Sequence, residues 1–304
     1  MAKVALACLG DLTLDIVVRA SGAALVGSDV GATVRFRAGG SAANTARAFA
    51  GLGGRAVFIG ALGNDEVGGR LRAFMRSAGV TVHAPRARGL SPRLVVTVSP
   101  SGERSFLTDR GVADSLSPSQ LRAAWLAKVD ALHVPFYSFM SEPLSATALA
   151  AIAAIRAARP RGLVSIDLAS RGPLQALGRR KVLDLLRATS PDVLLANEDE
   201  LAAIGSPSRE ALAKLAPICV IKQGPGGCRV VWSGGQAVVA TRRVKATDTT
   251  GAGDAFDAGF LHGLLSGGYR PGMKVDGALL RRAALAGHAS AASLLTLPRR
   301  ELAL

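Results

Sequence analysis

Asp248-Thr249-Thr250-Gly251-Ala252-Gly253-Asp254-Ala255-Phe256 follows an apolar, β-prone run (237–244) and opens a helix-like run (254–266). Three nearly side-chain-free residues, Gly251, Ala252 and Gly253, let an anion approach the unpaired N–H groups of a helix N-terminus closely. A carboxylate beside a phosphate is electrostatically unfavourable, which makes Asp254 a candidate for chemistry. An ordinary capped helix start explains each residue singly. The combination arises by chance with a probability on the order of 10⁻⁴.

The composition suits helices packed on a parallel sheet and disfavours a nucleic-acid-binding platform. The chain has 304 residues, 49% hydrophobic residues, 35 glycines and only 4% aromatics, so an aromatic nucleic-acid platform is disfavoured. The net charge is +15, but the basic residues are scattered in short groups at 179–181, 242–245, 281–282 and 299–300. We interpret these groups mostly as solvated surface that can also attract an anionic nucleotide.

Neither export nor membrane insertion is indicated. The three cysteines lack metal or disulfide spacing, and no uncharged run approaches the ~20 residues of a membrane helix. We therefore expect a cytoplasmic protein with no membrane or nucleic-acid partner.

Strand-like and helix-like runs alternate along most of the chain, which predicts a mostly parallel sheet covered on both faces. Two stretches, at about 12–38 and 91–108, are β-prone without an intervening helix, and the second contains a hairpin signal at Ser99-Pro100-Ser101-Gly102. We expect them to form a small second sheet within a single domain spanning 1–304. Helices are also predicted from the capping signal at Ser117 to about residue 128 and over 174–188.

The nonapeptide, together with Gly39-Gly40-Ser41-Ala42-Ala43-Asn44, resembles the two signatures of the ribokinase-like (PfkB) carbohydrate and nucleoside kinases. The signatures are far apart and in the right order, so the resemblance covers essentially the whole chain. It implies a Rossmann-like three-layer core with a β-sheet lid. It also implies transfer of the γ-phosphoryl group of ATP, with Mg²⁺, to a hydroxymethyl group of a sugar. Asp254 would be the general base and Gly251–Gly253 the anion hole. A nucleoside kinase and a catalytically idle binding relative remain open alternatives.

For the acceptor pocket, the resemblance implies Asp15 as the ligand of a sugar diol, because two carboxylate oxygens can accept from two adjacent hydroxyls. The other expected acceptor-binding positions are Asp11, Thr13, Gly39, Gly40 and Asn44. Ordinary turn residues and a polar residue at a helix start are the alternatives.

For the nucleotide, Asn197 and Glu200 are three residues apart, on one face of a short helix-like run. They match an Asn-x-x-Glu motif that organises Mg²⁺ through water. The other positions that match are Lys222, Gly224 and Gly227 in a glycine-rich loop, and His288 near the adenine. Asp248 and Thr250 match positions that hold K⁺ in many family members, and whether this chain keeps that ion stays open. The identity of the acceptor also stays open. Two copies of the chain could pair through the exposed edge of the lid, and this pairing stays open as well.

Overall fold

The computed structural model describes residues 3–22, 27, 29–98, 104–246 and 248–303. Its largest element is a nine-stranded sheet in the order β15-β14-β13-β12-β11-β10-β1-β4-β6. Seven strands run parallel, and only β14 and β15 are antiparallel to their neighbours. In chain order the strands are β1 (Ala5–Leu9), β4 (Arg55–Ile59), β6 (Val80–His83), β10 (Ala131–Pro135), β11 (Leu163–Asp167), β12 (Val193–Asn197), β13 (Ile218–Lys222), β14 (Cys228–Trp232) and β15 (Gly235–Val239).

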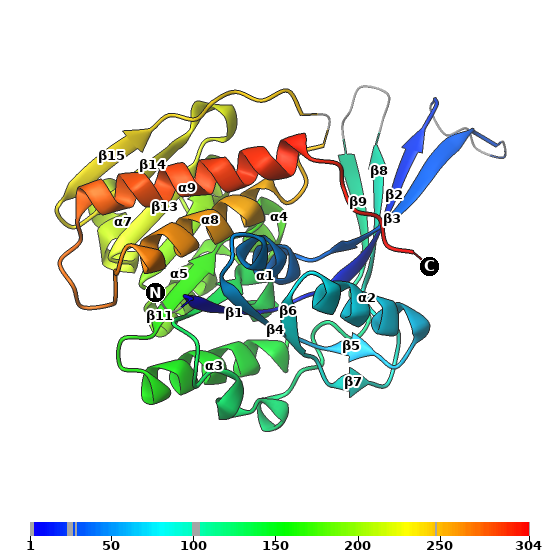
Figure 1. Cartoon of the computed structure of the whole chain (residues 1–304), viewed down its shortest axis with the longest axis horizontal. Helices are drawn as coiled ribbons and strands as arrows, with labels where there is room; N and C mark the ends of the chain where they lie inside the picture. Colours follow the sequence, from blue (N-terminus) through cyan, green and yellow to red (C-terminus); the bar gives the residue numbers. More distant parts are fainter. Residues whose placement is uncertain (1–2, 23–26, 28, 99–103, 247, 304) are drawn as a thin grey trace.

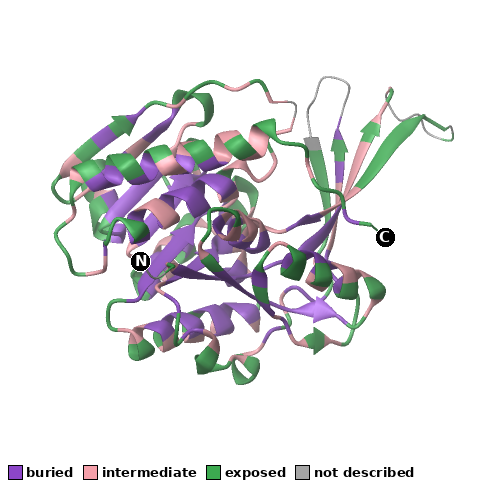
Figure 2. Cartoon of the chain, in the orientation of Figure 1, coloured by how far each residue is buried: buried purple, intermediate pink, exposed green. Residues whose placement is uncertain are grey.

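Helices cover both faces of this sheet, because the strands are apolar on both sides. In β1, Leu6 and Cys8 join one hydrophobic cluster, whereas Ala5, Ala7 and Leu9 join another on the opposite face. The first cluster includes α1 (Ser41–Gly51), α2 (Glu66–Ser77), α8 (Ala252–Ser266) and α9 (Gly277–Thr296). The second includes α3 (Leu144–Ala158), α4 (Arg171–Leu177), α5 (Arg179–Thr189), α6 (Glu198–Ala203) and α7 (Arg209–Leu215). Figure 2 shows the buried layer running through the centre of the molecule.

A separate four-stranded sheet projects to one side of the core (Figure 1). Its order is β3-β2-β8-β9, from strands β2 (Thr13–Ala20), β3 (Ala32–Gly39), β8 (Arg93–Val98) and β9 (Arg104–Asp109). These strands fall in the two stretches that lack helices, and we call this sheet the lid. The ribokinase-like α/β fold class is therefore confirmed. The hairpin signal at 99–102 lies outside the described residues, and a single domain over 1–304 stays a prediction. A two-stranded ladder joins β5 (Leu62–Gly63) to β7 (Arg86–Ala87).

Three elements predicted from local sequence signals differ from the structure. The helix predicted from Ser117 is wrong: the chain forms two 3₁₀ turns, η1 (Pro118–Gln120) and η2 (Ala123–Trp125), which are separated by extended backbone at Leu121 and Arg122. Leu126, directly after η2, is buried in the core. The capping interaction itself exists, since Ser117 N–H donates to Gln120 Oε1 (3.0 Å). The helix over 174–188 is broken at Gly178, whose φ of +86° separates α4 from α5. The strand expected over 237–244 ends at Val239.

The fold gathers the expected functional positions at one edge of the main sheet. Asp167, Asn197 and Lys222 are the last residues of β11, β12 and β13, so they lie at the carboxyl ends of neighbouring strands. Ligands of open α/β sheets bind at this edge. None of the described helices is long and apolar enough to cross a membrane.

Candidate active site

Asp254 lies where the N-termini of two helices meet. Gly251 caps α8 with a left-handed φ of +75°, and Asp254 is in the first turn. Its carboxylate accepts from Ser41 Oγ (2.6 Å) and from Asn44 Nδ2 (2.9 Å), both on the first turn of α1. Burial raises the pKa of Asp254 to about 6, and the two hydrogen bonds offset only part of that rise. The structure thus joins the two signatures around one carboxylate.

The loop before α8 supplies fewer amides than the sequence predicted. The N–H of Ala252 donates to Thr249 O (3.1 Å), so this amide is already used within the loop. Gly251 and Gly253 line the cavity beside Asp254. A Cβ at Gly253 would stand 3.5 Å from Lys222 Nζ. The candidate anion hole therefore narrows to Gly251 and Gly253.

One cavity, of about 670 Å³, lies between the lid and the helices; we call it the lid-side cavity. Of the expected acceptor positions, Asp15, Gly39 and Asn44 line it. Thr13 Oγ1 donates to Asp15 Oδ1 (2.6 Å), so Thr13 orients this carboxylate. Burial raises the pKa of Asp15 to about 6.

The glycine pair serves this arrangement. A Cβ at Gly39 would lie 2.0 Å from Asp15 Oδ2, and one at Gly40, where φ is +93°, would lie 2.5 Å from Asp11 O. A side chain at Gly39 would displace the Asp15 carboxylate, and one at Gly40 would displace the backbone at Asp11. Asp11 is engaged elsewhere, with its Oδ2 3.5 Å from Arg110 Nη1.

A second cavity, of about 580 Å³, is lined by Asp254, and Gly251 lines both this cavity and the lid-side cavity; we call it the nucleotide-side cavity. Asn197 and Glu200 line it and satisfy each other. Asn197 donates from its backbone N–H to Glu200 Oε2 (2.8 Å) and from Nδ2 to Oε1 (2.7 Å), and Glu200 N–H donates to Asn197 Oδ1 (2.8 Å). Burial and the neighbouring Asp167 raise the pKa of Glu200. Each carboxylate oxygen of Glu200 already accepts one hydrogen bond, and its remaining lone pairs fit the waters of a hydrated Mg²⁺.

Within the described residues no group of three or more acidic, histidine or cysteine side chains could hold a metal ion by itself. A metal at the nucleotide-side cavity would therefore need ligands from phosphates and water. Mg²⁺ keeps several waters and often bridges carboxylates to substrate phosphates, which this arrangement suits.

Lys222, expected to touch the nucleotide, is held mainly by two buried carboxylates. Its Nζ lies 2.9 Å from Asp167 Oδ1 and 3.1 Å from Asp257 Oδ1. Burial alone would lower the pKa of Lys222, but Asp167 and Asp257 outweigh it and raise the pKa. Burial raises the pKa of Asp257. Lys222 and Gly224 still line the nucleotide-side cavity.

The remaining two nucleotide positions have structural partners. The φ of Gly227 is +97°, and a Cβ at this residue would lie 2.3 Å from Val239 O, so the turn itself requires glycine. His288 Nε2 lies 3.1 Å from Val239 O, and its ring packs edge-on against Phe256 at 5.1 Å. The structure therefore ties His288 to β15 and α8 rather than bringing it to Lys222 and Gly224.

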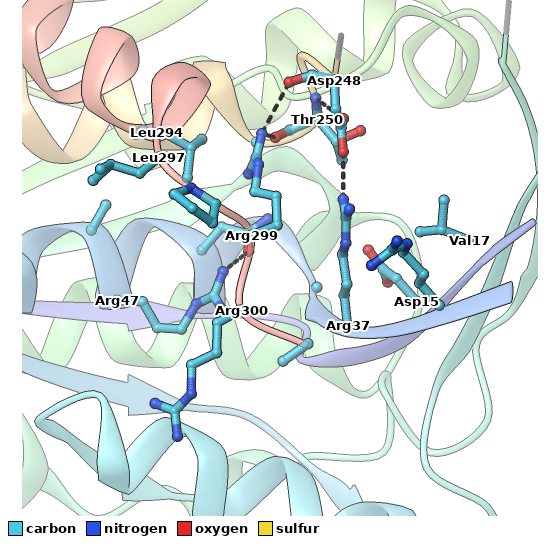
Figure 3. A pocket seen from close by; sticks show the side chains of 18 of the residues that line it. Asp15, Val17, Arg37, Arg47, Asp248, Thr250, Leu294, Leu297, Arg299 and Arg300 are labelled. Atoms are coloured by element: carbon cyan, nitrogen blue, oxygen red, sulfur yellow. Dashed lines mark hydrogen bonds and ion pairs between the residues drawn. The ribbon is translucent and has the colours of Figure 1, made fainter. Parts of the chain in front are cut away.

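The expected K⁺ position carries a guanidinium. Arg299 Nη2 donates to the backbone oxygens of Asp248 (3.1 Å) and Thr250 (2.9 Å), and Arg37 Nη1 pairs with the Asp248 carboxylate (Figure 3). Carbonyl oxygens are the groups that coordinate K⁺ in proteins. Because Arg299 already brings positive charge to these two oxygens, K⁺ does not fit the residues as they stand.

An α/β core with a lid, and a helix-terminal carboxylate in a cavity next to a second cavity under the lid, is the arrangement expected of a phosphotransferase of small molecules. The chain belongs to the pfkB family of carbohydrate kinases, whose model matches residues 4–298. It is accordingly a phosphotransferase with an alcohol group as acceptor.

The curated relatives support the family. A probable fructokinase-7 from Arabidopsis thaliana is 30% identical over 85% of this chain and 78% of its own length. An ATP-dependent ribose-1-phosphate kinase from Halopiger xanaduensis is 34% identical over 77% of this chain and 75% of its own. The crystal structure of adenosine kinase from Sinorhizobium meliloti, 24% identical, shares the fold with a TM-score of 0.82 over 97% and 95% of the two chains.

Sequence reasoning did not single out four residues of this region: Ser41, Arg47, Asp257 and Arg299. Ser41 stands inside the quoted glycine-pair signature, and Asp257 is an acidic residue three positions after Asp254 on an otherwise apolar helix. Both signals were available. Arg47 carries no local signal, and Arg299 stands in a basic group that was interpreted as solvated surface. The contacts of both residues in the site depend on how distant segments pack.

Proposed function

We propose that this kinase transfers the γ-phosphoryl group of ATP to a hydroxymethyl group of a sugar, with Asp254 as general base. The observation that carries the proposal is the place of Asp254. It borders the nucleotide-side cavity, and Gly251, at the start of its helix, lines both cavities. An acceptor in one cavity and a nucleotide in the other would meet at this carboxylate.

Asp254 would accept the hydroxyl proton as the oxygen attacks phosphorus, a role that requires the ionised carboxylate. Ser41 and Asn44 hold that carboxylate by hydrogen bonds, so its orientation is set before the acceptor binds. The amides of Gly251 and Gly253 would face the transferred phosphoryl oxygens, where positioning and charge stabilisation dominate the chemistry. Mg²⁺ would neutralise phosphate charge, held through water by Asn197 and Glu200.

The Mg²⁺ role has its own test. Glu200→Gln removes the negative charge while keeping one oxygen for Asn197, and it should raise the Mg²⁺ concentration needed for half-maximal activity. An unchanged Mg²⁺ dependence would remove Glu200 from the metal site.

The relatives name fructose, ribose 1-phosphate and adenosine as acceptors of different family members. A nucleoside acceptor is the second candidate, favoured by the adenosine kinase fold match. ADP release measured with ribose, fructose, ribose 1-phosphate and adenosine separates these functions. Turnover with a sugar supports the proposal, and turnover with adenosine alone transfers it to the nucleoside class. Saturable binding with no turnover of any acceptor favours a regulator.

We further propose that two copies pair through their lids. The supporting observation is apolar exposure: Val34, Phe106 and Leu107 are 50%, 55% and 66% exposed, and β9 is an edge strand. Light scattering at working concentrations should give twice the chain mass. A monomeric mass would reject the pairing.

A further inference from the structure

The wall of the lid-side cavity is strongly cationic. It is lined by six arginines and two aspartates, Asp15 and Asp248. The arginines are Arg19, Arg35, Arg37, Arg47, Arg299 and Arg300. Figure 3 shows Arg37, Arg47 and Arg299 entering the cavity from β3, α1 and the segment after α9. A neutral sugar needs no such excess of positive charge.

The segment after α9 builds part of this wall. Leu302 is buried, and its N–H donates to Phe36 O (2.8 Å), while Glu301 pairs with Arg35. These contacts hold the segment against β3. They place Arg299 and Arg300 at the cavity. Arg300 is exposed, as the sequence had suggested, whereas Arg299 is half-buried.

Some of these arginines form ion pairs inside the protein, whereas Arg47 forms none with a described residue. Arg37 pairs with Asp248 and Arg35 with Glu301. Among the described residues, the hydrogen-bond partner of Arg47 is the neutral amide of Asn44 (Nη2 to Oδ1, 2.9 Å). Its Nε is buried with no partner in the described structure.

The environment of Arg47 disfavours its charge. Burial lowers the pKa of Arg47, and the neighbouring Arg299 and Arg300 lower it further, although Asp254 and Asp15 oppose them. Arg47 and Arg300 also lie against the same ring, Phe74, at 5.2 and 4.7 Å from its centre. Like charges held this closely in a partly buried site are stabilised by an anion between them.

The position of Arg47 relates this anion to the reaction. Asn44 accepts from Arg47 and donates to Asp254, so one amide separates the guanidinium from the candidate base. A single small acceptor molecule could therefore present a hydroxyl to Asp254 and a second group to Arg47. Arginine offers only donors, arranged to bind phosphate or carboxylate oxygens in pairs.

We propose that the acceptor of this kinase carries an anionic group, a phosphate monoester or a carboxylate, that binds Arg47 beside Arg37 and Arg299 in the lid-side cavity. This inference rests on the proposed function, since it names the class of acceptor for the same site.

The test compares matched acceptors by calorimetry, independently of turnover. The pairs are ribose and ribose 1-phosphate, fructose and fructose 6-phosphate, and glucose and gluconate; the last distinguishes a carboxylate from a phosphate. At least one anionic member should bind about 30-fold or more tightly than its neutral partner, as expected for charge-assisted hydrogen bonds. Equal or weaker binding of all the anionic members would overturn the inference.

Variants locate the effect. Arg47→Met should reduce the preference for the anionic partner by about tenfold or more, and Arg47→Lys should restore part of it. Arg180→Met is the matched control, because its side chain is 97% exposed on α5. Retained ATP binding shows that Arg47→Met is folded. An undiminished preference in folded Arg47→Met would reject this residue as the anion site.

Measuring ADP release with the same acceptors distinguishes a failure of this inference from a failure of the proposed function. Selective binding of an anionic sugar without ADP release supports the inference and contradicts the proposed function. Turnover of a neutral sugar with no preference for its anionic partner leaves the proposed function intact and overturns the inference.

Discussion

Asn44 donates from Nδ2 to Oδ2 of Asp254 over 2.9 Å, although the two residues are 210 positions apart in the chain. The contact joins the start of α1 to the start of α8, so the two glycine-rich signatures form one site. It fixes one oxygen of the carboxylate, while Ser41 fixes the other. The predictions below follow from how this carboxylate and its neighbours are charged and held.

Activity should fall in mild acid. The pKa of Asp254 is raised to about 6, and a general base acts only when ionised, so protonation below that pH removes it. We expect kcat/KM to be level from pH 7 to 8 and to fall about tenfold per pH unit below 6. Asp15, whose pKa is also about 6, can steepen this slope. Asp15→Asn removes the contribution of Asp15, and a rate that stays level down to pH 5 in that variant would count against Asp254.

K⁺ should not be required. Arg299 occupies the backbone oxygens of Asp248 and Thr250, so replacing K⁺ with tetramethylammonium at about 0.1 M, a constant ionic strength, should leave turnover nearly unchanged. Arg299→Ala should lower turnover and make it respond to K⁺. A wild-type enzyme strongly activated by K⁺ would show that the ion displaces the guanidinium.

Lys222 should matter for stability as well as for the nucleotide. Lys222→Met leaves the buried carboxylates of Asp167 and Asp257 facing each other without a cation, which should cost about 3–5 kcal/mol of unfolding free energy. Because burial raises the pKa of Asp257, the loss should shrink as the pH is lowered and that carboxyl is protonated. Urea unfolding at pH 8 and pH 5 measures this, with the exposed Lys181→Met as control. Equal unfolding free energies for the two variants would contradict the role.

The sequence predicted the parts of the site that depend on short motifs. Asp254, Gly251, Gly253, Asn44 and the Asn197–Glu200 pair lie in local patterns whose geometry is set by helix starts and strand ends. The sequence did not predict the parts of the site that depend on tertiary packing. The arginine-lined cavity needs the lid, α1 and the segment after α9 to meet, and no run of residues announces that. The same limit explains the segment after Ser117, where a genuine capping signal is satisfied by a single 3₁₀ turn.

The types of residue along the chain predict the fold more directly than they predict the contacts of the site. Alternating apolar strands and helices predicted the parallel sheet, because both faces must be buried. The ion pairs of Lys222 join residues that are 35 and 55 positions apart in the chain. The hydrogen bonds of Arg299 join residues about 50 positions apart. Such partners become visible only when strand order and helix packing are known.

The most direct test of the account is the turnover number and ATP affinity of Asp254→Asn, measured side by side. Asparagine keeps an oxygen for Ser41 but cannot take the acceptor proton. Turnover should therefore fall by about 10²- to 10⁴-fold, the usual contribution of a general base. ATP affinity should change by no more than about threefold, since only the chemical step is lost. Near wild-type turnover in a folded, ATP-binding Asp254→Asn protein would contradict the assignment of Asp254 as the base.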